Sequence, residues 1–214
     1  MKILLLAPEQ QAHIISSILE EKKHQVFAIN SKISSDFLEE NQFDFLVSYG
    51  YRFILSEEIL SFFEPKKAIN LHISYLPYNR GADPNFWSLY EGTPSGVTIH
   101  YLDKGIDTGA IITQKKVSFN SALDTLKSSY NKLHVSIVEL FKEHISSILE
   151  GSCTSFKPLA KGSYHNSKDK DSLFACLKQR YPDPYTTPIS EIKNQTLKIR
   201  SKHENSSENF ISTK

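Results

Sequence analysis

The sequence predicts an α/β fold, built on an open and mostly parallel twisted sheet with helices on both of its faces. Short apolar runs alternate with segments of helical period through the first half of the chain. The first of these runs, residues 3–7, holds no polar residue, which is typical of a strand buried on both faces. This alternation favours a Rossmann-like arrangement, in which crossover helices cover a parallel sheet.

The first half of the chain holds four expected strands and the helices between them. After the strand at residues 3–7, a helix is expected over residues 12–21, because the isoleucines and Leu19 share one side. Further strands are expected over residues 25–29, 43–49 and 68–73. Ser56 is followed by two glutamates and predicts a helix start between the last two strands.

The middle of the chain changes character at residues 75–84, which are rich in Pro, Gly and Asn and are expected to form a loop. A short helix is expected next, over residues 85–90. Two strands are then expected over residues 96–102 and 110–119, joined by a glycine-containing turn at residues 103–109.

A long amphipathic helix is expected after this pair of strands. Ser121, with Asp124 three residues later, resembles a capping box at its start. Its apolar residues recur at spacings of three and four: Leu123, Leu126, Tyr130, Leu133, Ile137, Phe141, Ile145 and Ile148. The stripe predicts packing against the core, and a dimer face is the alternative. Beyond Gly151, one more strand is expected over residues 155–159 and a helix over residues 171–180.

The composition narrows the setting in which the protein works. Lysines and arginines total 25 against 24 acidic residues, and this net charge of +1 argues against nucleic acid as the main partner. The two cysteines form neither a disulfide framework nor a metal pattern, which favours a reducing, cytoplasmic location. The apolar run at the start is too short for a signal peptide. No window reaches the roughly 20 apolar residues of a membrane span, so no membrane partner is expected.

The fourth expected strand carries a row of polar side chains on one face. Residues two apart on a strand point the same way, so Asn70, His72 and Ser74 share a face. A polar row on a buried strand must be satisfied or used. This row lies at the carboxyl end of the strand, where open α/β sheets place their active sites. A hydrogen-bonded structural pair and an active site are both consistent with the pattern.

Two further segments concentrate polar residues. The turn at residues 103–109 holds glycines that let the backbone approach a ligand, with the carboxylate of Asp107 beside them. An ordinary hairpin turn fits the same pattern. The loop at residues 76–87 gathers an arginine, two asparagines, a tyrosine and the single tryptophan of the chain. Loops in that position often build the site, although Phe86 and Trp87 also fit a role as anchors in the core.

These three segments, in this order, resemble the formyltransferases that use 10-formyltetrahydrofolate. The resemblance runs from about residue 43 to residue 117 and is carried by Asn70-Leu71-His72, Leu76-Pro77 with Arg80-Gly81, and the 103–109 turn. It implies the formyltransferase version of the fold, with Asn70, His72 and Asp107 as the catalytic set and with no metal. We expect a catalytic domain over residues 1–151, a small C-terminal extension packed on it over residues 152–192, and a polar, disordered tail over residues 193–214.

The chemistry of formyl transfer suits the residue types of this set. When an amine attacks a formyl carbon, negative charge grows on the formyl oxygen, and Asn70 with a protonated His72 could donate hydrogen bonds to it. Asp107 could keep His72 charged and oriented, and could receive the proton that the amine loses, directly or through water. The remaining histidines are interpreted as surface or core residues: His13, His24, His100, His134, His144, His165 and His203.

In the resembled family, the pterin ring of the folate lies between the residues after the third strand and the Asp-Thr-Gly turn and is held largely by main chain. The resemblance therefore implies two groups of residues that contact N10-formyltetrahydrofolate. The first group is Arg52, Phe53, Ile54 and Leu55, and the second is Asp103, Lys104, Gly105 and Ile106. The glutamate tail of the folate is expected to extend toward solvent.

Three branches of that family compete for this chain. Methionyl-tRNA formyltransferases carry a large carboxy-terminal domain, for which too few residues remain after the long helix. Phosphoribosylglycinamide formyltransferases carry a glycine-rich phosphate loop after the first strand, where this chain has Ala7-Pro8-Glu9-Gln10-Gln11. Residues 78–88 and 161–165 look most like the enzymes that formylate amino sugars on nucleoside diphosphates. We therefore expect a small-molecule substrate, a dTDP-type amino-deoxy sugar.

The residues expected to contact that substrate are Ser74, Tyr78, Asn79, Arg80, Gly81, Asn85, Trp87 and Tyr164. Two other functions stay open. The chain could be a catalytically idle relative that binds folate or a partner, or it could hydrolyse the formyl donor with water in place of the amine. A homodimer is also left open.

Overall fold

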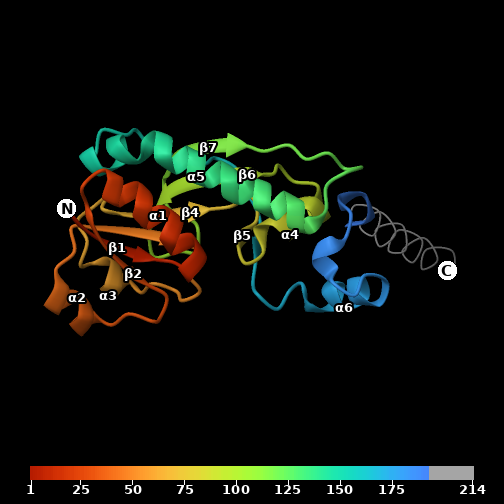
Figure 1. Ribbon diagram of the computed structural model, residues 1–214, viewed down its shortest axis with the longest axis horizontal. Coiled ribbons are helices and arrows are strands. Elements are labelled where there is room, and N and C mark those ends of the chain that lie inside the picture. Colours follow the sequence, from red (N-terminus) through yellow and green to blue (C-terminus); the bar gives the residue numbers. More distant parts are fainter. Residues whose placement is uncertain (193–214) are drawn as a thin grey trace, which may run out of the picture.

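The computed structural model describes residues 1–192 and is built around a six-stranded sheet with helices on both faces (Figure 1). The polar tail expected over residues 193–214 lies outside the described part. In chain order the elements are β1 Lys2–Leu6, α1 Glu9–Glu21, β2 Gln25–Ile29, α2 Ser35–Asn41, β3 Phe45–Tyr49, α3 Glu57–Leu60, β4 Ala68–His72, β5 Arg80–Gly81, α4 Pro84–Glu91, β6 Gly96–Tyr101, β7 Ile111–Lys116, α5 Leu126–Glu150, β8 Tyr164–His165, α6 Asp171–Arg180 and the 3-10 helix η1 Pro184–Thr186.

The sheet has the strand order β2-β1-β3-β4-β6-β7. Its first four strands run parallel, whereas β6 pairs antiparallel with both β4 and β7. The expected open, mostly parallel α/β fold is therefore confirmed. Because parallel strands end at the same edge of a sheet, β1, β3 and β4 present their carboxyl ends together. The polar row at the end of β4 lies at this edge.

The two faces of the sheet bury alternate residues of the same strands, as the period of two demands. On β1, Ile3 and Leu5 join the cluster beneath α1 and α5, while Leu4 and Leu6 join the cluster on the side of α2 and α3. All four side chains are fully buried. An uninterrupted apolar strand is thus explained by a sheet covered on both faces.

The long helix α5 lies across one face of the sheet and supplies much of its core (Figure 1). Most of the expected apolar stripe is buried, including Leu133, Ile137 and Phe141. The expected capping box at Ser121 is wrong. The helix begins at Leu126, because Thr125 and Ser128 form the reciprocal capping pair and satisfy the first free N–H groups.

Two members of the expected stripe therefore fall on the surface. Leu123 precedes the helix and is exposed, and Tyr130 is 41% exposed. Asp124, the other half of the expected box, is buried and accepts hydrogen bonds from Asn120 and Lys132.

Truncation of Phe141 should strongly destabilise the fold. The ring is fully buried between α5 and the sheet, so Phe141→Ala removes a large apolar contact and leaves a cavity. We expect a loss of about 3–5 kcal/mol in the free energy of unfolding, measured by urea denaturation. Val135→Ala, on the exposed side of the same helix, is the control and should change that free energy by less than about 0.5 kcal/mol. Equal losses in the two variants would contradict this placement.

Two local expectations differ from the structure. The helix α2 was not among the expected elements, because its seven residues are too few to show a helical period. Ser34 marks its start by accepting a hydrogen bond from the backbone of Phe37. The strand expected over residues 155–159 is wrong. Only an isolated bridge between Phe156 and Ile111 forms there, and Pro158 has no N–H with which to extend it.

The described C-terminal elements pack on α4 and the start of α5. Phe86 and Trp87 share an apolar cluster with Leu177, Ile189 and Ile192. The division of the chain at residues 151 and 152 stays a prediction. Within residues 1–192, no helix is both long and apolar enough to span a membrane.

Candidate active site

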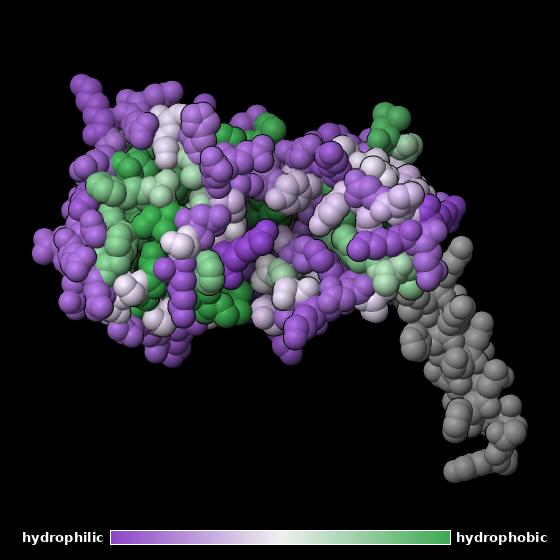
Figure 2. Space-filling view, turned by 60° about the horizontal axis from the view of Figure 1, so that its bottom comes forward, coloured by the Kyte–Doolittle hydropathy of each residue, from purple (hydrophilic) through white to green (hydrophobic). Residues whose placement is uncertain are grey.

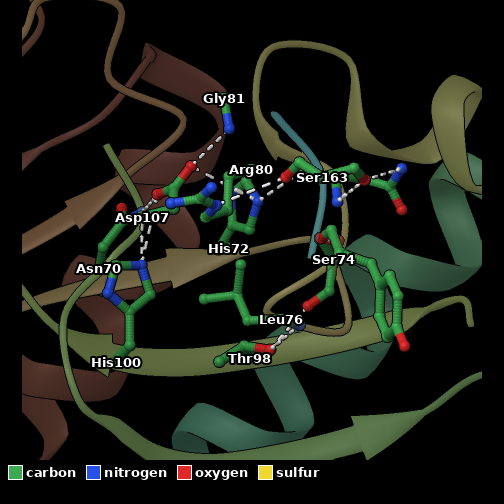
Figure 3. Close-up of polar contacts among 12 residues, drawn as sticks. Asn70, His72, Ser74, Leu76, Arg80, Gly81, Thr98, His100, Asp107 and Ser163 are labelled. Atoms are coloured by element: carbon green, nitrogen blue, oxygen red, sulfur yellow. Dashed lines mark hydrogen bonds and ion pairs between the residues drawn. The ribbon is translucent and has the colours of Figure 1, made fainter. Parts of the chain in front are cut away.

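Three elements bring polar side chains together at the carboxyl end of β4. Asn70 and His72 project from β4, His100 projects from the neighbouring β6, and Asp107 comes from the turn after β6 (Figure 3). The antiparallel register places Asn70 directly opposite His100. The cluster therefore forms because two adjacent strands each carry polar residues on the same face of the sheet.

Asp107 lies at the centre of this cluster. Its Oδ1 accepts a hydrogen bond of 3.1 Å from the amide of Asn70, and its Oδ2 accepts one of 2.8 Å from the backbone N–H of Gly81. Its Oδ2 lies 3.6 Å from His72 Nε2, and its Oδ1 lies 3.4 Å from His100 Nε2. An amide, two imidazoles and a carboxylate thus converge on one point, as expected for Asn70, His72 and Asp107.

The turn that carries Asp107 depends on close backbone approach. Asp107 itself has a φ of 52°, in the left-handed region that Asp tolerates better than most residues. A Cβ at Gly109 would lie 1.7 Å from the carbonyl oxygen of Tyr101, so only glycine fits there. Asp103 fixes the turn from within by accepting hydrogen bonds from Gly105 N–H and the Thr108 hydroxyl. The turn aims Asp107 at the end of β4.

Asp107 is held as a carboxylate. Burial disfavours its charge, but the nearby His72, the contacts with His100 and the Gly81 N–H outweigh burial and hold its pKa well below the usual range. A carboxylate with a low pKa orients and stabilises a positive partner better than it accepts a proton. Which of the two expected roles Asp107 takes, orienting His72 or also accepting the proton of the amine, stays a prediction.

His72 is buried, and burial lowers its pKa from the ordinary value, although Asp107 acts in the opposite direction. Its Nε2 faces two acceptors, Asp107 Oδ2 and the carbonyl oxygen of Asn79 at 3.3 Å. This arrangement requires the proton on Nε2. Burial thus favours the neutral imidazole of His72 in the absence of substrate, and the charged form expected from the sequence stays a prediction for the reacting complex.

The amide nitrogen of Asn70 faces two partners inside the cluster. One N–H group points to Asp107 Oδ1, and the amide nitrogen also lies 3.3 Å from His100 Nε2. His100 Nδ1 lies 2.8 Å from the carbonyl oxygen of Tyr101 and donates to it. Its Nε2 therefore accepts from Asn70 when the ring is neutral and donates to Asp107 Oδ1 when the ring is protonated. For Asn70 to stabilise a formyl oxygen, one N–H group of its amide must turn to the substrate.

His100 is the site residue that the sequence analysis missed. The sequence predicts a surface or core position for His100, and the residue is buried, with 1% of its surface exposed. The available signal was the alternation of Thr98 and His100 with Val97 and Ile99, which is the same pattern as on β4. Its contact with Asp107 depends on the register between β4 and β6, which no local pattern reveals.

The eight residues expected to bind substrate fall into two groups. Four remain at the rim of the site: Tyr78, Arg80, Gly81 and Tyr164, of which Tyr164 is 46% exposed. The other four are buried and serve the fold. Ser74 donates to the carbonyl oxygen of Tyr78, and Asn85 donates to α5 at Leu126 and Ser129. Trp87 stacks on His165 at 3.8 Å, and Asn79 is fully buried. Substrate contact by these four stays a prediction that their present contacts do not support.

The two segments expected to hold the folate lie next to each other. Lys104, in the turn after β6, pairs with Glu57 at the start of α3 over 3.7 Å. Leu55 and Leu102 pack on the same apolar cluster. Phe53, Ile54 and Ile106 expose 42%, 74% and 36% of their surfaces, so apolar side chains flank the site on both segments.

Within residues 1–192, no group of three or more His, Cys, Asp and Glu side chains lies close enough to hold a metal ion. The expected absence of a metal stays a prediction.

A family model described as formyl transferase matches residues 4–145, which include the whole polar cluster. This chain belongs to the formyl transferase family. The formyltransferase PseJ from Anoxybacillus kamchatkensis was solved with UDP-4,6-dideoxy-4-formamido-L-AltNAc and tetrahydrofolate. The two chains are 40% identical with a TM-score of 0.83, and the match covers 92% of this chain and 100% of PseJ.

Two curated members of the formyl transferase family match less of their own length. The dTDP-4-amino-4,6-dideoxyglucose formyltransferase of Mycobacterium bovis is 36% identical over 107 residues, which are 50% of this chain and 45% of the relative. The methionyl-tRNA formyltransferase of Thermodesulfovibrio yellowstonii is 34% identical over 171 residues, covering 74% of this chain and 53% of the relative. This chain spans about half the length of these two curated relatives.

Proposed function

We propose that this protein transfers the formyl group of N10-formyltetrahydrofolate to the amino group of a sugar linked to a nucleoside diphosphate. One observation carries the proposal: Asn70 and His72 converge on Asp107 at the carboxyl edge of the sheet, within 3.1 Å and 3.6 Å. The relative PseJ, matched along its full length, was solved with a formamido sugar nucleotide and tetrahydrofolate, which supports both substrate classes.

The donor would supply a formyl carbon that is open to attack by an amine. Asn70 and His72 provide the N–H groups that can stabilise the charge developing on the formyl oxygen. Asp107 orients His72 and favours its protonated form as that charge grows. The amine loses one proton, which passes to the site directly or through water, while the nitrogen of the departing folate gains one. The products are a formamide and tetrahydrofolate.

The residues between β3 and α3 suit a flat heterocycle with donors and acceptors on its edge. In the described part of the chain, the backbone groups of residues 52–55 make no hydrogen bond to other backbone groups. These groups remain available for a ring edge, while Phe53, Ile54 and Ile106 offer apolar surface. Figure 2 shows apolar side chains gathered on the larger half of one face, with a hollow between this half and the smaller one.

The start of α1 argues against a ribonucleotide phosphate at that position. A phosphate loop places free N–H groups and a positive helix end toward the anion. Here Pro8 caps α1, it lacks an N–H, and the acidic Glu9 follows in the first turn. A negative side chain at this point repels a phosphate. This observation favours the amino-sugar nucleotide over phosphoribosylglycinamide.

The carrier nucleotide is proposed as UDP or dTDP. The sequence predicted a dTDP-type sugar, and the mycobacterial relative is named for one. The relative matched along its full length, PseJ, was solved with a UDP sugar. Both carriers therefore belong in the assay.

Arg80 is the residue at the rim that best suits the diphosphate. Its Nε donates to the carbonyl oxygen of Ser163 at 3.4 Å, and within residues 1–192 no carboxylate pairs with its guanidinium. We expect Arg80→Met to raise the KM for the sugar nucleotide about 10- to 100-fold, as loss of a charged hydrogen bond would, with a smaller change in kcat. Steady-state kinetics measure both. Lys142→Met on exposed α5 surface is the charge-matched control, and an Arg80→Met KM equal to that control would contradict the assignment.

Mass spectrometry tests the proposed function directly. The protein is incubated with N10-formyltetrahydrofolate and, in separate reactions, with UDP- and dTDP-linked amino sugars, phosphoribosylglycinamide and methionyl-tRNA. We expect an amino-sugar nucleotide to gain the mass of one CO. Formylation of tRNA or ribonucleotide alone would replace the proposal with another branch. Breakdown of the donor without any amine, and no mass gain, would identify a hydrolase.

Two broader expectations accompany the proposal. The two cysteines of the described part are free thiols, which fits the expected cytoplasmic location. A homodimer stays a prediction.

A further inference from the structure

The backbone of residues 79–81 touches both acidic and basic members of the catalytic set. The carbonyl oxygen of Asn79 accepts a hydrogen bond of 3.3 Å from His72 Nε2. The N–H of Gly81 donates one of 2.8 Å to Asp107 Oδ2. Both His72 and Asp107 therefore take their orientation from one short loop, which the sequence analysis assigned to the substrate. Whatever holds this loop also sets the geometry of the site.

A segment far along the chain, around β8, holds the loop of residues 79–81 in place by hydrogen bonds. β8 pairs with β5 in parallel, so that Arg80 N–H donates to Ser163 O at 3.0 Å and Ala82 N–H donates to His165 O at 2.9 Å. The approach is so close that a Cβ at Gly81 would lie 2.3 Å from the carbonyl oxygen of His165. Figure 3 shows Ser163 beside the loop and close to His72 and Arg80. This segment lies beyond residues 4–145, where the family match ends.

Three side chains, those of Ser163, Glu91 and Thr93, also hold the loop in place. The hydroxyl of Ser163 accepts a hydrogen bond of 2.9 Å from the backbone N–H of Asn79 and lies 3.3 Å from Glu91 Oε2, to which it donates. Glu91 Oε2 also accepts from the amide of Asn79 at 3.0 Å, and its Oε1 lies 2.9 Å from His165 Nε2. Thr93 donates to the amide oxygen of Asn79 at 2.7 Å.

Asn79 needs this support. It is fully buried and has a φ of 55°, a backbone conformation that costs free energy outside glycine. Every polar group of its side chain is engaged by Glu91, Thr93 or Ser163. Such a network holds one conformation of a loop rather than a range of them.

We propose that Ser163 and Glu91 are positioning residues of the formyl transfer reaction, because they hold residues 79–81 against His72 and Asp107. Neither touches the catalytic side chains directly, so both act through the loop backbone. The inference rests on the proposed function for its kinetic part, but the orientation of His72 can be measured without substrate.

Ser163→Ala is the informative variant. It leaves the buried N–H of Asn79 without its acceptor and frees the loop to shift. Because a displacement of about 1 Å at a reacting group can cost about 100-fold in rate, we expect kcat to fall about 10- to 100-fold. The KM for N10-formyltetrahydrofolate should stay close to the wild-type value, because the hydrogen bonds of Ser163 go to Pro77, Asn79, Arg80 and Glu91 and not to the expected folate segments at residues 52–55 and 103–106. Ser163→Thr keeps the hydroxyl and should restore kcat.

The titration of His72, followed by NMR with labelled histidine, supplies a readout that a purely structural role would not move. Its signal is identified by its loss in His72→Asn. The groups that face His72 are Asp107, His100 and the carbonyl oxygen of Asn79. Asp107 and that carbonyl both raise the pKa of His72. A looser loop weakens the contacts of His72 with Asp107 and with the Asn79 carbonyl oxygen. We therefore expect the pKa of His72 to fall further in Ser163→Ala.

Two controls keep the outcomes separate. Ser155→Ala removes an exposed hydroxyl outside the network and should leave kcat and the His72 titration unchanged. Glu91→Gln keeps the shape and weakens the network, so its kcat should lie between those of Ser163→Ala and the wild type. A folded Ser163→Ala protein with wild-type kcat and wild-type His72 titration would overturn the inference. If the wild type itself transfers no formyl group, the proposed function fails, and the titration alone decides the positioning role.

Discussion

Asp107→Asn is expected to reduce turnover about 1,000-fold, within the range of about 10²- to 10⁴-fold typical of groups that assist proton transfer. The asparagine keeps the shape of the side chain but removes its charge. His72 then loses the neighbour that favours its protonated form, since Asp107 lies 3.6 Å from His72 Nε2 and raises its pKa. The developing charge on the formyl oxygen loses its stabilising partner. Single-turnover kinetics with the labelled donor measure the effect.

The affinity for tetrahydrofolate separates this loss from a loss of binding. We expect its dissociation constant in Asp107→Asn to stay close to that of the wild type, because the folate is expected to be held mainly by main chain. Asp36→Asn, on the exposed surface of α2, is the matched control and should keep full turnover. Near-normal turnover in Asp107→Asn would refute the assigned role.

His72→Asn is expected to have an effect of similar size, again about 1,000-fold on turnover. The asparagine can still donate a hydrogen bond, but it cannot carry a proton or a positive charge at neutral pH. His13→Asn, on the exposed side of α1, is the matched control. Circular dichroism should show that both variants are folded before their rates are compared.

The double variant tests whether the two residues act as a unit. Since Asp107 acts on the reaction chiefly through His72, the variant that lacks both should be little slower than either single variant. The measurement is the double-mutant cycle on kcat. Rate losses that multiply, so that the double variant is about a million-fold slower, would show independent roles and contradict the coupling.

Local patterns predicted most of the fold, because burial of a strand or helix imposes a regular pattern of apolar residues on the sequence. The apolar run at β1 and the stripe on α5 reflect such burial directly. The start of α5 was misplaced because Ser121 and Thr125 offer similar capping signals, and only Ser128 completes the pair. The local sequence predicted a strand over residues 155–159. Strand pairing depends on a distant partner, however, and only the bridge between Phe156 and Ile111 forms.

Strand alternation and the turn motif predicted only a part of the site. Alternation placed Asn70 and His72 on one face, and the resemblance brought in Asp107. The role of His100 depends on strand register, and those of Glu91 and Ser163 on contacts across 72 residues of chain, for which no local signal exists. Asn79 was assigned to the substrate because a polar loop residue near a site suggests binding. Its burial shows that it is engaged within the protein.

The central claim is that Asn70, His72 and Asp107 act together on one formyl carbon beside a bound folate. A crystal structure of the wild-type protein with tetrahydrofolate and the amino-sugar nucleotide tests it most directly. We predict the pterin between residues 52–55 and 103–106, and the sugar amine about 3–3.5 Å from the position of the transferred carbon, next to His72 and Asp107. A folate bound elsewhere, or an amine remote from these side chains, would contradict the account.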